Sequence, residues 1–256
     1  MKIAVCIKQV PTREWQPRID DSKRGVREQD ASFEMNEPDA YALEEALRLR
    51  EKHGGEVVVC TAGPARASQV LREALARGAD RAIHVEHDRL SSITTDSFVI
   101  AGALADAVRE EKFDLVLTGL QSDDQGAAQT GVILAERLDV PHATIVMDVQ
   151  VQESVVRVKR ELEGGWFQWV QMPLPALLTI QSGINQLRYA TLKGIMAAKK
   201  KEIRKVTPAS LPAAHSSIVG LDVPRKTKQT QLIPGSPAEA ARGLIQKLRD
   251  EARVIG

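Results

Sequence analysis

The fold is decided by three short apolar runs: residues 2–7 (KIAVCI), 56–61 (EVVVCT) and 114–118 (DLVLT). Each run is continuously apolar after its first residue, apart from a final threonine in two of them, which is typical of a strand buried on both faces of a parallel sheet. A fourth run, residues 81–86 (RAIHVE), alternates more between polar and apolar residues. Together these runs predict the central strands of one sheet.

Helical patterns fill the stretches between these runs. Residues 38–52 repeat apolar side chains every three or four positions, which is the spacing of an amphipathic helix. Residues 65–77, 97–111 and 127–138 also predict helices, and Gly78 is suited to end the first of these three. Regular alternation of strand and helix predicts a doubly wound α/β fold, with a mostly parallel sheet covered by helices on both faces.

The pattern changes after about residue 142. Strand-like runs at residues 143–151, 155–162, 166–171 and 176–181 follow one another with little helix between them. Glu163-Gly164-Gly165 between the second and third runs is a hairpin signal. We therefore predict an antiparallel addition at an edge of the parallel sheet.

The last part of the chain reads as an extended arm. Lys199, Lys200, Lys201, Arg204 and Lys205 form a basic cluster, and residues 207–235 are rich in Pro, Ser and Thr. After them, residues 236–239 (SPAE) form a capping box with proline at the first helical position. They predict a terminal helix that runs to about residue 252 and needs a surface to pack on.

Composition excludes several classes of protein. The 256 residues are 43% hydrophobic, enough for a sizeable core, and the net charge of +1 predicts no nucleic-acid partner. The two cysteines lie in apolar runs and the five histidines are scattered, so we expect buried thiols and no metal site. No apolar stretch reaches the ~18 residues of a membrane span. We expect a cytoplasmic protein that does not insert into a membrane.

The most informative candidate for a ligand site is residues 119–131 (GLQSDDQGAAQTG). This segment leads from the carboxyl end of a predicted strand into a helix, which is where ligands bind in doubly wound sheets. Free N–H groups at a helix start suit a phosphate. Gln129 and Thr130 could also donate hydrogen bonds to one, whereas Asp123 and Asp124 could hold ribose hydroxyls or cap the helix. Because the segment is neither a P-loop nor a GxGxxG loop, an ordinary capped loop remains an alternative.

Motifs for catalysis are absent from the sequence. It contains no Gly-x-Ser-x-Gly elbow, no paired cysteine–histidine signature and no HExxH motif. The adjacent pair Asp123 and Asp124 is more typical of solvated loop carboxylates than of an acid–base couple, and Trp166 and Trp169 read as packing residues. We therefore expect a protein that is not an enzyme by itself.

Seven ordered blocks resemble the β subunits of electron transfer flavoproteins, over nearly the whole chain. They are KIAVCIKQVP (2–11), NEPDAYALEEALRLRE (36–51), TAGPA (61–65), ALARGADRAIHV (74–85), DLVLTGLQSDDQGAAQTG (114–131), VKRELEGGWFQWVQMPLPALLT (158–179) and RYATLKGIMAAKKK (188–201). The resemblance implies an electron carrier that pairs with an α subunit carrying the redox FAD.

The resemblance also implies an adenine nucleotide in this subunit, either AMP or, in electron-bifurcating members that oxidise NADH, a second FAD. The bifurcating loop resembles DGDTAQVGP, whereas residues 124–132 here read DQGAAQTGV, which favours AMP. The implied nucleotide contacts are Cys6, Asn36, Glu37, Pro38, Asp39, Ala62, Gln121, Ser122, Asp123, Asp124, Gln125, Gly126, Ala127, Ala128, Gln129, Thr130 and Gly131. Arg13 and Trp15 occupy the stretch where a family tyrosine approaches the flavin.

The same resemblance implies partners and boundaries. It implies docking of flavoprotein dehydrogenases, of acyl-CoA or amine type, and delivery of electrons to a quinone oxidoreductase. The implied docking residues are Tyr189, Leu192, Ile195, Met196 and Lys199. We expect a nucleotide-binding domain over residues 1–190, a partner-recognition loop and basic segment over 191–205, and an arm over 206–256 that packs on the α subunit.

Overall fold

The computed structural model describes residues 1–90, 93–224 and 230–255. The chain divides into two compact units, Met1–Leu221 and Asp222–Gly256, which are described separately below.

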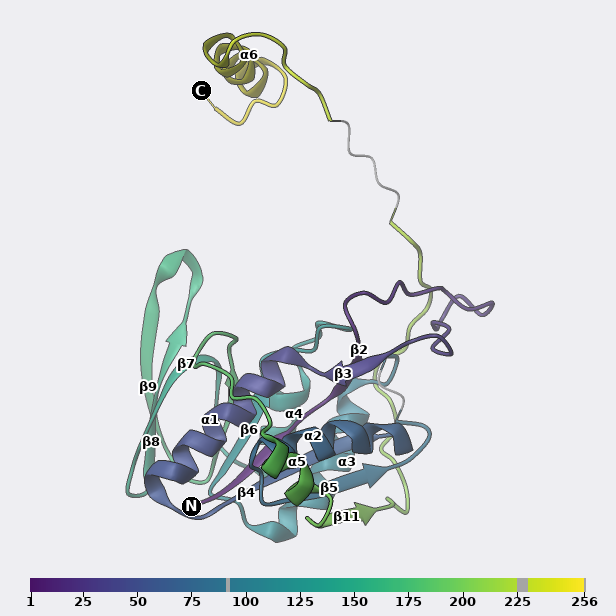
Figure 1. Ribbon diagram of the computed structural model, residues 1–256, viewed down its shortest axis with the longest axis vertical. Coiled ribbons are helices and arrows are strands. Elements are labelled where there is room, and N and C mark those ends of the chain that lie inside the picture. Colours follow the sequence, from purple (N-terminus) through teal and green to yellow (C-terminus); the bar gives the residue numbers. More distant parts are fainter. Residues whose placement is uncertain (91–92, 225–229, 256) are drawn as a thin grey trace. The chain divides into compact units, whose positions relative to one another are not determined.

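The larger unit is built on a nine-stranded sheet in the order β11-β5-β4-β1-β6-β10-β7-β8-β9 (Figure 1). Neighbouring strands from β11 to β7 are all parallel, and β7, β8 and β9 are antiparallel. The strands are β1 (Lys2–Cys6), β4 (Glu56–Gly63), β5 (Arg81–Glu86), β6 (Leu115–Gly119), β7 (His142–Gln152), β8 (Val155–Glu161), β9 (Phe167–Pro173), β10 (Ala176–Ile180) and β11 (Ile203–Val206).

Helices cover both faces of this sheet, which confirms the doubly wound prediction. On one face α1 (Glu37–His53) and α2 (Ser68–Arg77) bury Leu43, Leu47 and Leu71 in the same apolar cluster as Val5. On the other, α3 (Ser97–Val108) and α4 (Thr130–Leu138) bury Leu104 and Leu134 with the alternate strand positions. Each central strand therefore contributes to both cores, which explains why its sequence is apolar without alternation.

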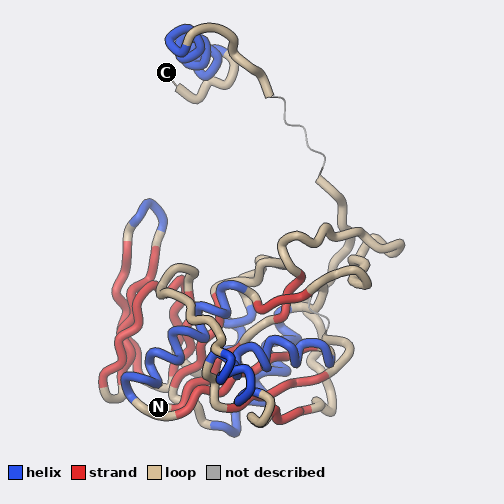
Figure 2. Tube along the Cα trace, in the orientation of Figure 1, coloured by secondary structure: helices blue, strands red, loops and turns tan. Residues whose placement is uncertain are grey.

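The predicted antiparallel addition is correct for the β8–β9 hairpin and wrong for the run at residues 176–181. Glu163–Gly165 (η3) forms the turn at the hairpin tip, which Figure 2 shows projecting past the neighbouring strands. The last run, β10, instead lies between β6 and β7 and is parallel to both. All five residues of β10 are buried, so its apolar run carries the same signal as β1.

Helix boundaries differ from the prediction where the backbone cannot continue as a regular helix. The range predicted as a helix at 65–77 begins with a 3₁₀ turn, η1 (Ala65–Ala67), and the range at 97–111 ends with another, η2 (Arg109–Glu111). The third predicted helix begins at Thr130 instead of residue 127, because Gly126 and Ala128 have φ values of 62° and 54°. These left-handed residues keep the loop open until α4 starts.

A small second sheet precedes α1 and was not predicted. It pairs β2 (Gln9–Pro11) with β3 (Phe33–Met35) in antiparallel register. Next to it, the Asn36 N–H donates to the Lys8 carbonyl at 3.0 Å, so the start of α1 is tied to the end of β1.

The C-terminal elements complete both units. In the larger unit α5 (Leu192–Ala198) packs on α2, and β11 extends the sheet beside β5. In the smaller unit α6 (Pro237–Asp250) begins with the predicted capping box between Ser236 and Glu239. No helix within the described ranges is both long enough and apolar enough to cross a membrane.

Candidate functional site

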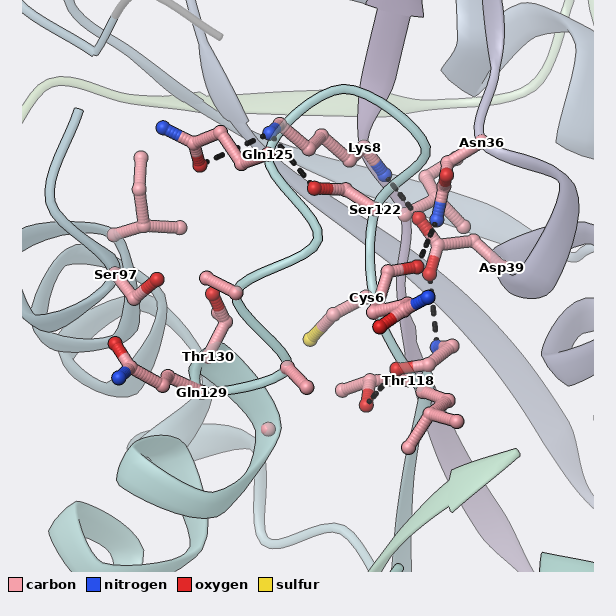
Figure 3. A pocket seen from close by; sticks show the side chains of 18 of the residues that line it. Cys6, Lys8, Asn36, Asp39, Ser97, Thr118, Ser122, Gln125, Gln129 and Thr130 are labelled. Atoms are coloured by element: carbon pink, nitrogen blue, oxygen red, sulfur yellow. Dashed lines mark hydrogen bonds between the residues drawn. The ribbon is translucent and has the colours of Figure 1, made fainter. Parts of the chain in front are cut away.

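A pocket lies where the carboxyl ends of β1, β4 and β6 meet the first turns of α1, α3 and α4. The space between the lining residues is about 740 Å³, open solvent at the mouth included. Figure 3 shows Ser97, Gln129 and Thr130 on one side and Lys8, Asn36 and Asp39 on the other, with the Cys6 sulfur pointing into the space between them. This is the strand-end position predicted for a doubly wound sheet.

Asp39, in the first turn of α1, ties two of these strand ends together. Its carboxylate accepts the backbone N–H of Lys8 at 2.7 Å and that of Gly119 at 2.8 Å. Burial raises the pKa of Asp39 to about 7, although the N–H donors of Lys8 and Gly119 act in the opposite direction. A Cβ at Gly119 would overlap Pro38 and Asp39, so only glycine lets α1 approach β6 this closely.

Asn36 fixes the loop that follows β6. Its side-chain amide donates to the Gln121 carbonyl at 3.0 Å and accepts from the Asp123 N–H at 2.9 Å. Because the side-chain N–H and oxygen of Asn36 both bond to the backbone of the loop after β6, Asn36 fixes the shape of the pocket rim.

Lys8 supplies a positive charge at the pocket wall. Its ammonium group lies 2.6 Å from Asp124, 3.2 Å from the Ser122 hydroxyl and 3.3 Å from the Gln125 amide oxygen. Burial lowers the pKa of Lys8, and the neighbouring Asp124 carboxylate acts in the opposite direction. The ion pair between Lys8 and Asp124 joins the end of β1 to a loop 116 residues later in the chain.

The start of α4 offers free backbone donors to the pocket. Its N-cap residue, Gln129, makes no side-chain capping bond, so the first N–H groups of the helix and its positive dipole end are available to an anion. A Cβ at Gly131 would lie 2.7 Å from both Thr118 Oγ1 and Thr179 Cγ2. Glycine at this position lets the helix start sit directly against β6 and β10.

The remaining wall is apolar. Cys6, Ala62, Ile100 and Leu104 line it together. Burial, the neighbouring Cys60 and Asp39 raise the pKa of the Cys6 thiol, in that order of importance, so the thiol is neutral and serves as apolar surface. An apolar wall opposite a helix start can accept a flat base and an anion at the same time.

Most of the predicted contact residues share this pocket. Those that line it are Cys6, Asn36, Asp39, Ala62, Gln121, Ser122, Gln125, Ala127, Ala128, Gln129, Thr130 and Gly131. Glu37, Pro38, Asp123, Asp124 and Gly126 do not line it. Asp124 instead pairs with Lys8, and neither Asp123 nor Asp124 caps α4, since Gln129 occupies the N-cap.

Sequence reasoning missed part of the wall. The prediction did not include Lys8 or Thr118 at the strand ends, nor Ser97, Ile100 and Leu104 of α3. The position of Lys8 and Thr118 at the ends of β1 and β6 was a usable signal. The α3 residues carried none, because that helix is apolar around most of its circumference.

Arg13 and Trp15 lie in the loop between β2 and β3. Arg13 pairs with Glu37 and lies 3.8 Å from Asp123, with 67% of its side chain exposed. The Trp15 indole donates to Asp30 at 3.3 Å. These contacts place Arg13 at the outer edge of the pocket loop.

The predicted docking residues form an exposed apolar face on and beside α5. Tyr189 is 89% exposed, Leu192 84% and Met196 63%; Ile195 and Lys199 are also exposed. The helix itself is held firmly, because Arg72 donates to the carbonyls of Ala198 and Lys201. We name Tyr189, Leu192, Ile195, Met196 and Lys199 the α5 face.

Only part of the basic cluster is free to meet a partner. Lys201 donates to the carbonyls of Leu75 and Ala79 at the end of α2. Arg204 pairs with Glu111, and Lys205 pairs with Glu86. Lys199 and Lys200 are exposed. Over the described parts of the chain, His, Cys, Asp and Glu side chains form no group of three that could hold a metal.

The fold defines a Rossmann-like α/β protein with a pocket at the carboxyl ends of its central strands. A model of the electron transfer flavoprotein domain matches residues 24–211. The chain is 36% identical over 263 residues to the electron transfer flavoprotein subunit beta of Methylophilus methylotrophus, covering 98% of each chain. It is 38% identical to the mitochondrial electron transfer flavoprotein subunit beta of Oryza sativa subsp. indica over the full length of both chains. It is 34% identical to the electron transfer flavoprotein subunit beta of Homo sapiens over 99% of both.

The chain therefore belongs to the electron transfer flavoprotein family, among its β subunits. This confirms the family inferred from the seven sequence blocks, and with it a role in electron transport by a flavoprotein.

Proposed function

We propose that this chain is the β subunit of a heterodimeric electron carrier and holds AMP as a structural nucleotide. The observation that carries the proposal is the uncapped start of α4 at the ends of β1 and β6, facing an apolar wall. The helix start suits the phosphate, and the wall at Cys6, Ala62 and Ile100 suits the adenine. AMP bound there stabilises the fold, because a ligand that binds only the native state adds stability.

A second FAD is the alternative occupant. A second groove, lined by polar residues such as Asp96 and Ser216 and by apolar ones such as Ile93 and Ile218, adjoins the pocket. The two share Ser97, Gln125, Ala127 and Gln129. The second groove offers space next to the phosphate end for a larger nucleotide. In that case the subunit would be the NADH-oxidising half of an electron-bifurcating complex.

The α subunit is the proposed permanent partner and carries the redox FAD. Two surfaces of this chain support such a partner. The β8–β9 hairpin exposes Trp166, Phe167 and Trp169, and α6 exposes Leu244 and Ile245. Exposed aromatic and aliphatic groups gathered on one element are typical of protein interfaces.

The α5 face is the proposed docking site for flavoprotein dehydrogenases of the acyl-CoA or amine type. An apolar anchor with lysines at its edge gives specificity and fast association without tight binding. Electrons then pass to a quinone oxidoreductase, and the cytoplasm is the proposed compartment. The chain alone catalyses no reaction in this scheme.

The test is a count of the nucleotides released from the denatured heterodimer. One FAD and one AMP per dimer are expected. Two FAD and no AMP would overturn the AMP assignment and move the protein to the bifurcating class. One FAD with no second nucleotide would overturn the assignment of the pocket itself.

A further inference from the structure

Asp96 is used twice in this structure. It is the N-cap of α3, where Oδ1 accepts the Phe98 N–H at 3.0 Å. Its other oxygen, Oδ2, accepts the backbone N–H groups of His215 at 2.6 Å and Ser216 at 2.9 Å. One carboxylate therefore joins the start of a helix to a segment about 120 residues later.

We name this later segment, residues 207–221, the strap. It is extended, and it leads from β11 to the end of the larger unit. The His215 ring stacks on Phe98 with centroids 3.9 Å apart, and Pro212 crosses α3 at Gly102, where a Cβ would lie 2.5 Å from it. At its far end the Leu221 N–H donates to the Lys23 carbonyl at 2.8 Å.

Asp96 is charged in this setting. Burial by itself would raise its pKa, but the backbone donors Phe98, Ser216 and His215 outweigh burial and lower the pKa. A carboxylate that accepts several backbone N–H bonds holds them more strongly than a neutral acceptor does. The bonds to the strap are therefore the main polar contacts that hold it at this point.

The same helix start forms part of the nucleotide pocket. Ser97, the residue after Asp96, lines the pocket, as do Ile100 and Leu104 one and two turns later. Gln125 in the pocket loop donates to the carbonyls of Ile93 and Thr95, directly before Asp96. A ligand that orders this wall also orders the carboxylate that holds the strap.

We propose that Asp96 couples nucleotide binding to the anchoring of the strap. A nucleotide in the pocket fixes the start of α3, and Asp96 then holds His215 and Ser216. By reciprocity, a held strap raises nucleotide affinity by the same factor. Asp96 is a positioning residue in this scheme, and the coupling rests on the proposed function of the pocket.

Asp96→Ser is the variant that separates the two uses. Serine is as good an N-cap as aspartate, but its single hydroxyl cannot also reach the strap. His215→Ala tests the same link from the other side, since it removes the ring stack and leaves the carboxylate. Asp106→Ser, on an exposed position of the same helix, is the matched control.

The experiment uses the full-length chain in complex with its α subunit, with AMP as the probe. Amide hydrogen exchange at residues 213–221 and the Kd for AMP are measured for each protein. In the wild type, AMP is expected to slow exchange at His215 and Ser216 about fivefold or more. Asp96→Ser should remove this protection and weaken AMP by a similar factor, His215→Ala should reduce both, and Asp106→Ser should match the wild type.

The outcomes separate the coupling from the function of the pocket. If the wild type binds AMP but exchange at His215 and Ser216 does not respond, the coupling is overturned and the pocket assignment stands. The coupling is also overturned, and the pocket assignment stands, if Asp96→Ser and His215→Ala both bind AMP as tightly as the wild type does. If the wild type binds FAD in place of AMP, the exchange comparison is made with FAD and decides the coupling in the same way. If it binds neither, the pocket assignment fails and the coupling falls with it.

Discussion

Replacing Lys8 by methionine tests whether the pocket loop is held by a buried ion pair. Methionine is unbranched and only one atom shorter than lysine, so it keeps most of the packing but removes the charge. The ammonium lies 2.6 Å from Asp124, and only 25% of the Lys8 side chain and 7% of the Asp124 side chain are exposed. The change therefore leaves a carboxylate nearly buried and without its cation.

The expected loss of stability follows from that burial. Removing one partner of a fully buried pair costs about 3–5 kcal/mol. Because a quarter of the Lys8 side chain reaches solvent, we expect a smaller loss for Lys8→Met, about 2–3 kcal/mol, which is at or just below the lower limit of that range. Asp124→Asn should cost less, about 1–2 kcal/mol, because the remaining ammonium keeps the oxygens of Ser122 and Gln125.

The double variant decides the matter. Once both charges are gone no buried charge is left unpaired, so the double loss should be smaller than the sum of the single losses by about 1–2 kcal/mol. Urea unfolding followed by circular dichroism measures all three, with Lys200→Met, at an exposed lysine, as the control expected to change stability by less than about 0.5 kcal/mol. Losses that add to within about 0.5 kcal/mol would refute the reasoning.

Three further predictions concern the strand ends, the pocket and the α5 face. Hydrogen bonding from Arg81 lowers the pKa of Glu111 to about 2. The stability that the Glu111 carboxylate contributes is therefore complete above its unfolded pKa and is lost as pH falls from about 4.5 toward 2. The urea midpoints of the wild type and Glu111→Gln should converge in acid, and a constant gap between them from pH 3 to 7 would contradict this. Gly131→Ala should push the start of α4 away from Thr118 and Thr179. This should lower the free energy of unfolding by about 1–3 kcal/mol and weaken AMP binding, measured by calorimetry, about tenfold. Gly220→Ala is the control, because a Cβ there has open space, and it should change neither quantity. Leu192→Ala should leave the unfolding midpoint unchanged, since the side chain is 84% exposed. If Leu192 is the anchor of docking, the variant should slow reduction of the heterodimer's flavin by an acyl-CoA or amine dehydrogenase about 30-fold. Equal stopped-flow rates for the variant and the wild type would argue against that role.

The parallel core could be predicted from sequence because a strand buried on both faces has an apolar run without polar–apolar alternation. β5 has the predicted bounds, Arg81–Glu86, and the runs that became β1, β4 and β6 lack alternation. β10, whose five residues are all buried, has the same apolar run without alternation. It was misread because the neighbouring runs belong to a hairpin, and proximity in sequence was given more weight than the apolar pattern.

The loop of the site could be predicted, but its contacts could not. Residues 119–131 stand out because they are small and polar between a buried strand and a helix. A lysine directly after a strand reads as an exposed residue, and nothing in the spacing of Lys8 and Asp124, 116 positions apart, shows that they pair. The late start of α4 was also hidden, because Ala127 and Ala128 favour helix by propensity while the backbone at Ala128 is left-handed.

The α5 face shows how a short exposed element can still be displayed rigidly. Its helix, Leu192–Ala198, has seven residues, and an isolated helix of that length is not stable in water. Its conformation must therefore come from α2, on which it packs so closely that a Cβ at Gly194 would overlap the Ala76 carbonyl. Arg72 holds the far end of the helix by bonding to the Ala198 carbonyl at 2.6 Å. Because α2 already orders the helix, a protein that bound this face would not have to order it, and less entropy would be lost on binding.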